Sequence, residues 1–230
     1  ARQSLSAVYM AGRIGKLTTP EDMAKVIAQV PELLSHLIEA GATSYNAGHI
    51  VTTLSDAATA RLLQLAEEQF GPPPVPYVWM AGGSQGRQEQ TALSDQDNCL
   101  IIDDAYDADQ HGEYFKKLAE YVCDGLHKVG YVYCPGEMMA KIDEWRQPVR
   151  TWQKYFNKWI EQPEPKSLMY CSVWFDLRPV HGTKSLFDEL HRMIVSKAKD
   201  NRIFQAYMVG NALTHHVPRG FFKNFVMIRG

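Results

Sequence analysis

The most informative stretch of the chain is residues 82–102, which read GGSQGRQEQTALSDQDNCLII. It begins with a turn at Gly83-Ser84, and backbone N–H groups of a glycine-serine turn that opens a helix can hold phosphate oxygens. Two aspartates, Asp95 and Asp97, then lead into an apolar strand. Because they are two residues apart on a strand, their carboxylates point to one face and can share a divalent metal ion. This combination indicates phosphoryl chemistry.

A third carboxylate is predicted further along the chain. Two metal ions can stabilise both ends of an in-line displacement at phosphorus, and Mg²⁺ (or Mn²⁺) binds carboxylate oxygens. Residues 169–180 are predicted to form a long strand in which Asp176 interrupts an apolar run. A buried aspartate is costly there unless it is paired or bound to metal. We therefore expect Asp176 to join Asp95 and Asp97; the alternative is an ion pair between Asp176 and Arg178.

Two arginines are candidate phosphate ligands. Arg87, one turn after Ser84, can neutralise a triphosphate, and the alternative is a salt bridge to Glu89 or to a nearby aspartate. Arg178 can reach a phosphate as well. Ser84 can also cap its helix, which is compatible with phosphate binding. The predicted phosphate-binding set is Gly82, Gly83, Ser84, Gly86, Arg87 and Arg178.

Composition excludes several classes of protein. The chain has 230 residues, 45% of them hydrophobic, so it can bury a core in one large or two small domains. The net charge of −2 and the lack of a basic stripe argue against nucleic acid as a partner, and so against a nucleic-acid polymerase. No apolar run is long enough to span a membrane, and residues 1–20 lack a signal-peptide core. We therefore expect a cytoplasmic protein without a membrane partner.

The cysteines and a histidine pair are weaker candidates for chemistry. No two cysteines form a CxxC pair, so buried reduced thiols are favoured over a disulfide or a zinc site. The pair His215-His216 has no third ligand at a suitable spacing and is expected at the surface or at a helix end. The four cysteines are Cys99, Cys123, Cys134 and Cys171.

Helical patterns dominate the first third of the chain. Thr19 and Pro20 are typical of a helix start, and this helix is expected to reach Ala40 with a kink at Pro31. A second amphipathic stretch covers about residues 45–70, so that the two form a helical hairpin. The sequence GPPP that follows forbids regular structure and marks a domain boundary.

The pattern beyond the prolines alternates strands and helices. Short strands are predicted over residues 77–81, 98–102 and 132–133 and a long one over 169–180, with helices over 84–93, 107–129, 149–160 and from 185. The expected fold class is therefore α+β: an N-terminal helical hairpin and a small mixed β-sheet core flanked by helices. The expected domains are residues 1–74 (helical), 75–182 (catalytic) and 183–230 (the start of a C-terminal helical substrate-binding region).

The motifs resemble those of the DNA polymerase β-like nucleotidyltransferase superfamily. They are residues 83–90 (GSQGRQEQ), 95–98 (DQDN) and 175–180 (FDLRPV). The closer resemblance is to signal-transduction nucleotidyltransferases related to the uridylyltransferases that modify the PII regulatory protein. It covers about residues 21–230. Members of that family often carry CBS or cyclic-nucleotide-binding sensor domains ahead of the catalytic unit.

The resemblance implies specific roles. Ser84 and its backbone would hold the β- and γ-phosphates, Asp95 and Asp97 would bind metal, and Asp176 would be the third carboxylate and a candidate base. The implied enzyme moves AMP or UMP from a nucleoside triphosphate to a hydroxyl, with a regulatory protein as the expected acceptor. The alternative is a nucleotide-binding regulatory module with little catalysis. No sensor domain precedes the hairpin and the chain stops within the expected C-terminal region, so we expect a fragment of a longer protein.

Overall fold

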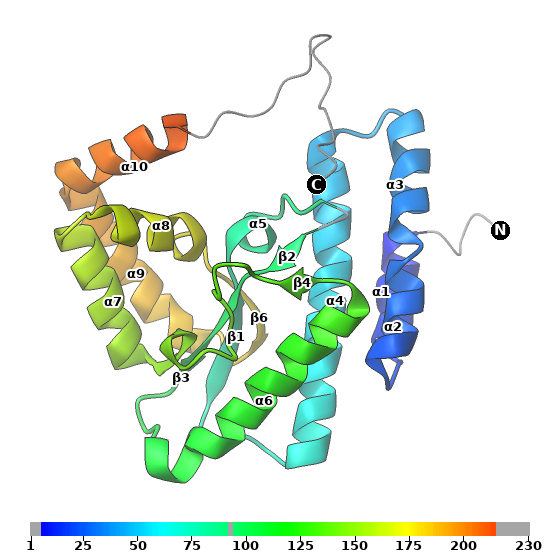
Figure 1. The fold of residues 1–230 in the computed structure, drawn as a ribbon, viewed down its shortest axis with the longest axis horizontal. Helices are drawn as coiled ribbons and strands as arrows, with labels where there is room; N and C mark the ends of the chain where they lie inside the picture. The colour runs from blue at the N-terminus through cyan, green and yellow to red at the C-terminus, as the bar shows by residue number, and fades with distance from the viewer. Residues whose placement is uncertain (1–5, 92–93, 215–230) are drawn as a thin grey trace.

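A four-stranded mixed sheet forms the centre of the protein, in the order β5-β3-β1-β6 (Figure 1). The computed structural model describes residues 6–91 and 94–214. Strand β1 is antiparallel to both of its neighbours, β3 and β6, whereas β5 is parallel to β3. The four strands are β1 (Tyr77–Ala81), β3 (Asn98–Ile102), β5 (Arg146–Pro148) and β6 (Arg178–Gly182). The predicted α+β class with a small mixed sheet is confirmed.

Helices cover both faces of this sheet, which explains why β1, and β3 after Asn98, consist of apolar residues. Every residue of these two strands is buried, as expected for strands with covered faces. Helices α4 and α6 lie on one side and α7 and α9 on the other (Figure 1). Trp152 of α7 also donates its indole N–H to the Leu100 carbonyl of β3 at 3.0 Å. The four helices are α4 (Ser44–Phe70), α6 (Ala108–Val129), α7 (Val149–Glu161) and α9 (Ser185–Asp200).

The predicted helix from Pro20 to Ala40 is two helices. Helix α2 (Pro20–Ile27) ends before α3 (Val30–Glu39) begins, so the expectation of one kinked helix is wrong. Pro31 has no N–H, and its ring would clash with the carbonyl four residues earlier in a continuous helix. In the first turn of α3 the missing N–H costs nothing. Helices α3 and α4 form the predicted hairpin, and α1 (Ala7–Ile14), which the sequence analysis does not predict, packs against α4.

Two further predictions about local structure are wrong. The helix expected over residues 84–93 is, as far as residue 91, a single turn, α5 (Gly83–Gly86), because the backbone turns left-handed at Gln88, where φ is +59°; residues 92–93 lie outside the described part of the chain. The strand expected over residues 169–180 begins only at Arg178. Its first half is helix α8 (Pro165–Trp174). The side chains that α8 buries are three or four residues apart, and a short apolar run does not distinguish this helical pattern from a strand.

The remaining elements complete the layers. Strands β2 and β4 form a small parallel pair beside the main sheet, and α10 follows α9 (Figure 1). These elements and a short 3-10 helix are β2 (Asp95–Gln96), β4 (Val132–Tyr133), η2 (Asp143–Trp145) and α10 (Arg202–Thr214). All four cysteines are free and buried, as predicted. The predicted pair His215-His216 lies outside the described residues. Within them, none of the helices combines the length and the apolar character that a membrane crossing requires.

Close packing of α4 against α6 gives a first prediction. Gly125 of α6 leaves room for Leu62 of α4, since a Cβ at Gly125 would lie 2.8 Å from Leu62 Cδ2. Leu62 is fully buried. Leu62→Ala should lower the free energy of unfolding by about 2–5 kcal/mol, measured by urea denaturation.

In the Leu62→Ala background, Gly125→Ala should restore part of this loss. The added methyl fills the cavity, and alanine favours a helix over glycine by about 1 kcal/mol. In the wild-type background the same change should be less favourable because the methyl meets Leu62. An equal effect of Gly125→Ala in both backgrounds would contradict this packing.

Candidate functional site

The glycine-rich turn lies at the end of the central strand. Strand β1 ends at Ala81, and α5 begins two residues later at Gly83. The left-handed φ of Gly83, +51°, suits glycine, and a Cβ there would overlap Asp97 Oδ2. A Cβ at Gly86 would lie 2.6 Å from the carbonyl oxygen of Asp176. The glycines therefore let this turn approach both aspartates.

The turn presents unpaired backbone donors. Gly86 and Arg87 donate their N–H groups to the carbonyls of Gly82 and Gly83, which closes the helical turn. In the described part of the chain, the N–H groups of Gly83, Ser84 and Gln85 have no acceptor. Amides at the start of a helical turn attract anions. The turn has the donors that phosphate binding requires.

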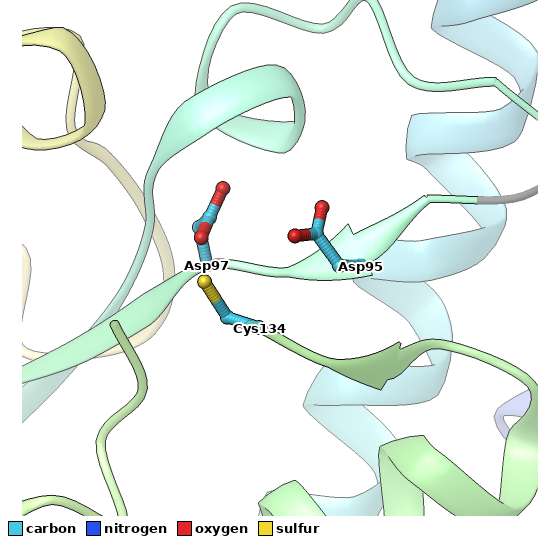
Figure 2. Close-up of side chains that lie close together, drawn as sticks. All are labelled: Asp95, Asp97 and Cys134. Carbon is cyan, nitrogen blue, oxygen red and sulfur yellow. The ribbon is translucent and has the colours of Figure 1, made fainter. Parts of the chain in front are cut away.

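Two carboxylates and a thiol gather beside this turn. The ligand atoms of Asp95, Asp97 and Cys134 all lie within 4.8 Å of one another. Asp95 pairs with Val132 in the parallel β2–β4 register, and the next residue of β2 pairs with Tyr133. Continued by one residue, this register brings Cys134 opposite Asp97. Figure 2 shows the sulfur beside Asp97 and both carboxylates pointing to the same side.

The electrostatics of the cluster favour a cation. Burial raises the pKa of Asp97, and the charge of Asp95 raises it further, against a hydrogen bond with Cys134 and the charge of Arg87. Burial also raises the pKa of Cys134 to about 12, and Asp97 contributes to the increase. Asp95, Asp97 and Cys134 thus lie close together in a partly buried site with little compensating positive charge. The donor set fits a divalent metal ion, held by Asp95 and Asp97.

Gln96 and Asn98, which alternate with the two aspartates, fix the position of Cys134. Gln96 and Asn98 are buried, and their amide groups lie on the opposite side of the strand from the carboxylates. Gln96 Nε2 donates to the Tyr131 carbonyl at 3.1 Å, and Asn98 Oδ1 accepts from the N–H of Ala140 at 2.8 Å. These bonds hold both ends of the loop that carries Cys134.

Asp176 lies apart from the other two aspartates. It belongs to the turn between α8 and β6, and not to a strand, and its side chain is 52% exposed. Among the described residues, the group that could hold a metal contains Asp95, Asp97 and Cys134 but lacks Asp176. The carboxylate of Asp176 lies 3.9 Å from Arg87 Nη1. The positive charge of Arg87 also lowers the pKa of Asp97, against the effect of burial. Arg87 therefore links the two parts of the predicted site.

Both predicted arginines have protein partners. Arg87 forms the alternative salt bridge with Glu89, at 2.5 Å, in addition to its weaker contact with Asp176. Arg178 does not pair with Asp176 as the alternative proposed. Its guanidinium forms two hydrogen bonds, of 2.8 and 2.9 Å, with the carboxylate of Asp56 on α4.

Asp56 connects α4 to the glycine-rich turn. Besides Arg178 it accepts a hydrogen bond from Gln85 Nε2 at 2.9 Å, and Arg178 also donates to the Gln85 carbonyl at 3.1 Å. One carboxylate on α4 therefore fixes both the turn and the start of β6. Sequence reasoning missed this role, and its one local signal is a charged residue among the buried positions of α4.

An open pocket of about 480 Å³ lies between the end of α5, the turn before β6 and helix α9. Phe175, Leu177 and Ile194 give it apolar walls, and Asp176 and His191 add polar groups. The pocket provides room for a substrate group beside Asp176.

Comparison with known families identifies the chain. Residues 28–166 match the family described as putative nucleotidyltransferase DUF294, which is more than half of the sequence. The chain belongs to this family. No curated protein matches it. The nucleotidyltransferase match contains the glycine-rich turn, Asp95, Asp97 and the missed residues Asp56 and Cys134, and it ends before Asp176.

The Asp56–Arg178 pair gives a prediction about stability. Both side chains are about three-quarters buried, at 27% and 24% exposure. Asp56→Ala leaves the Arg178 guanidinium without its counter-ion and should lower the free energy of unfolding by about 1–3 kcal/mol. The double variant Asp56→Ala/Arg178→Ala should lose less than the sum of the two single changes.

The matched control is the exposed ion pair between Glu161 and Lys197, at 2.7 Å. Glu161→Ala should remain within about 0.5 kcal/mol of wild type. Additive effects of Asp56→Ala and Arg178→Ala in urea denaturation would contradict the coupling.

Proposed function

We propose that the protein is a Mg²⁺-dependent nucleotidyltransferase that moves AMP or UMP from a nucleoside triphosphate to a hydroxyl, with pyrophosphate leaving. The observation that carries the proposal is the contact between the two halves of the site. Gly83, in the turn that carries the unpaired amides, lies directly against the Asp97 carboxylate, because a Cβ on this residue would overlap Asp97 Oδ2. A triphosphate bound on this turn would have its phosphates next to Asp95 and Asp97.

Each group has a proposed role. The N–H groups of Gly83 and Ser84 hold the β- and γ-phosphate oxygens, and Gly82 and Gly86 allow the close approach. Asp95 and Asp97 hold Mg²⁺ (or Mn²⁺), which would neutralise phosphate charge during transfer. Arg87 exchanges its salt bridge with Glu89 for a phosphate oxygen.

Asp176 is proposed to act on the acceptor. Its exposed carboxylate lines the pocket beside α9, where it can accept the proton of an incoming hydroxyl. Arg178, fixed by Asp56, holds the start of β6 in place next to this turn. We propose residues 75–182 as the catalytic domain, with residues 183–230, which include α9, contributing to acceptor binding.

The proposed acceptor is a regulatory protein in signal transduction, and the proposed compartment is the cytoplasm. Both rest on the resemblance of the motifs to signal-transduction nucleotidyltransferases. CBS or cyclic-nucleotide-binding domains elsewhere in a longer protein would then control the transfer.

One observation favours a second function. The carboxylate of Asp176 does not belong to the cluster of Asp95 and Asp97. A nucleotide-binding regulatory module with little catalysis needs the turn and the carboxylate pair, but it does not need a third carboxylate close to them. The two functions differ in turnover and share nucleotide binding.

Calorimetric titration of ATP, UTP, CTP and GTP, with and without Mg²⁺, tests the proposal. Wild-type protein should bind one triphosphate in a Mg²⁺-dependent manner, and Asp95→Asn/Asp97→Asn should lose this binding. The absence of binding by any of the four triphosphates would overturn the proposal. Binding without release of pyrophosphate in the presence of candidate acceptor proteins would favour the regulatory module.

The substitution Asp97→Asn should stabilise the metal-free protein and at the same time abolish its response to Mg²⁺ and triphosphate. Burial raises the pKa of Asp97 in the folded protein, so ionisation of this carboxyl costs stability as the pH rises above its unfolded pKa. Asp97→Asn removes that cost. The metal-free variant should therefore have a higher Tm than wild type at pH 7, and the difference should shrink as the pH falls toward 4.

The same variant should lose the increase in Tm that Mg²⁺ and triphosphate give to wild type. Glu89→Gln, which changes an exposed carboxylate near Arg87, is the control and should keep that increase. A metal-free Asp97→Asn protein with a lower Tm than wild type would contradict the electrostatic description of the site.

A further inference from the structure

Cys134 is a ligand type that a magnesium site does not need. Mg²⁺ binds oxygen and retains most of its water, whereas thiolates select softer ions such as Zn²⁺. Yet the Cys134 sulfur lies within 4.8 Å of a carboxylate oxygen of both Asp95 and Asp97. The cluster thus offers three protein ligands from two neighbouring segments of the chain, residues 95–97 and residue 134, and the set contains one sulfur and two oxygens.

We propose that Asp95, Asp97 and Cys134 form a Zn²⁺ site that binds Zn²⁺ more tightly than Mg²⁺, and that Zn²⁺ in this site blocks the proposed transfer. This inference rests on the proposed function only for its inhibitory consequence. The Zn²⁺ site itself is a property of the three side chains. Zn²⁺ displaces the proton of the thiol to solvent, and Cys134 binds as the thiolate.

The geometry suits the size of the ion. In a tetrahedral site with Zn–O of about 2.1 Å and Zn–S of about 2.3 Å, ligand atoms lie roughly 3.3–3.8 Å apart. The ligand atoms here already lie within 4.8 Å of one another, so a movement of about 1 Å brings them to these distances. Three protein ligands leave the fourth position for water, as in catalytic zinc sites.

The fold prevents Cys134 from leaving the cluster. Its side chain is 8% exposed, and the loop that carries it is held by Gln96 and Asn98, as described above. The N–H of Glu137 also donates to the Cys134 carbonyl at 3.0 Å, which closes a turn directly after it. An ion that enters between Asp95 and Asp97 therefore meets the sulfur.

The other three thiols are not alternatives in the described part of the chain. None of them belongs to a group of three ligand atoms of this kind. Cys123 donates its thiol to Asn98 Oδ1 at 3.5 Å, on the other side of the strand from the carboxylates. Cys171 is buried on α8 and provides a matched control.

Co²⁺ is the probe that tests the site, because a thiolate bound to Co²⁺ gives a near-ultraviolet charge-transfer absorption that oxygen ligands do not give. Titration of the whole chain with Co²⁺ should produce this band at one equivalent. The band should disappear in Cys134→Ser and in Asp97→Asn and persist in Cys171→Ala. Zn²⁺ should remove the band from wild type at one equivalent, while a thousandfold excess of Mg²⁺ should leave it in place.

The contribution of Cys134 to the site is measured as the loss of Zn²⁺ affinity when the thiol is removed. Calorimetry should show a loss in Cys134→Ser that exceeds the roughly 10–100-fold cost of removing a partner outside the ligand shell. Mg²⁺-dependent triphosphate binding by Cys134→Ser should equal that of wild type, since Mg²⁺ does not use the sulfur. Wild-type protein that binds Co²⁺ without the charge-transfer band would overturn the inference, and this measurement needs no variant to fold.

The two proposals fail separately. Triphosphate binding with Mg²⁺ in a protein that shows no cobalt–thiolate band keeps the proposed function and overturns the Zn²⁺ site. A band that Zn²⁺ removes, in a protein that binds no triphosphate, supports the Zn²⁺ site and overturns the proposed function.

Discussion

The antiparallel pairing of β1 with both β3 and β6 determines where everything else in the site lies. A strand that runs antiparallel to β1 starts where β1 ends, so the beginnings of β3 and β6 meet the turn that follows Ala81. Asp97 comes directly before β3, and Asp176 comes two residues before β6. This hydrogen-bonded arrangement therefore brings three segments of the chain, the turn after Ala81, the segment at Asp97 and the segment at Asp176, to one edge of the sheet. The glycines of α5 are then required because that edge is crowded.

Alternate side chains of the sequence Asp95-Gln96-Asp97-Asn98 lie on opposite faces of the extended chain. The carboxylates face the turn, and the two amides face the interior and hold the loop from Tyr131 to Ala140. A buried amide without partners is unfavourable, so the interior network has to be complete for the strand to form. The geometry of the acidic face is therefore a consequence of hydrogen bonds made on the hidden face.

The parts of this arrangement that the sequence predicts are those set by local spacing. The glycine-serine turn, the aspartate pair and the long helices α4, α6 and α7 follow from periodicity and capping, and the structure has them at the predicted places. The extent of α8 could not be predicted, because its run of apolar residues fits a helix and a strand equally well. Asp176 consequently lies in an exposed turn instead of a buried strand.

Cys134 and Asp56 could not be found from the sequence for a different reason. Cys134 meets Asp97 through the register of two short parallel strands, and Asp56 meets Arg178 across 122 positions. Neither contact leaves a spacing pattern in the chain. Both contacts depend on how separate elements pack. Strands β2 and β4 pair over only two residues each, and such short strands have too little apolar pattern for their register to be predicted.

The position of Asp56 has a mechanical consequence. Helix α4 has 27 residues and is about 40 Å long, and a helix that is packed along its side behaves as a stiff rod. Helices α1, α2 and α3 pack against α4, while Asp56 near the middle of α4 is bonded to Gln85 and Arg178. Rotation or sliding of α4 by more than a fraction of an ångström would break these bonds or carry the phosphate-binding turn with it. A movement of the N-terminal helices that shifts α4 would therefore also shift the turn at Gly83-Ser84.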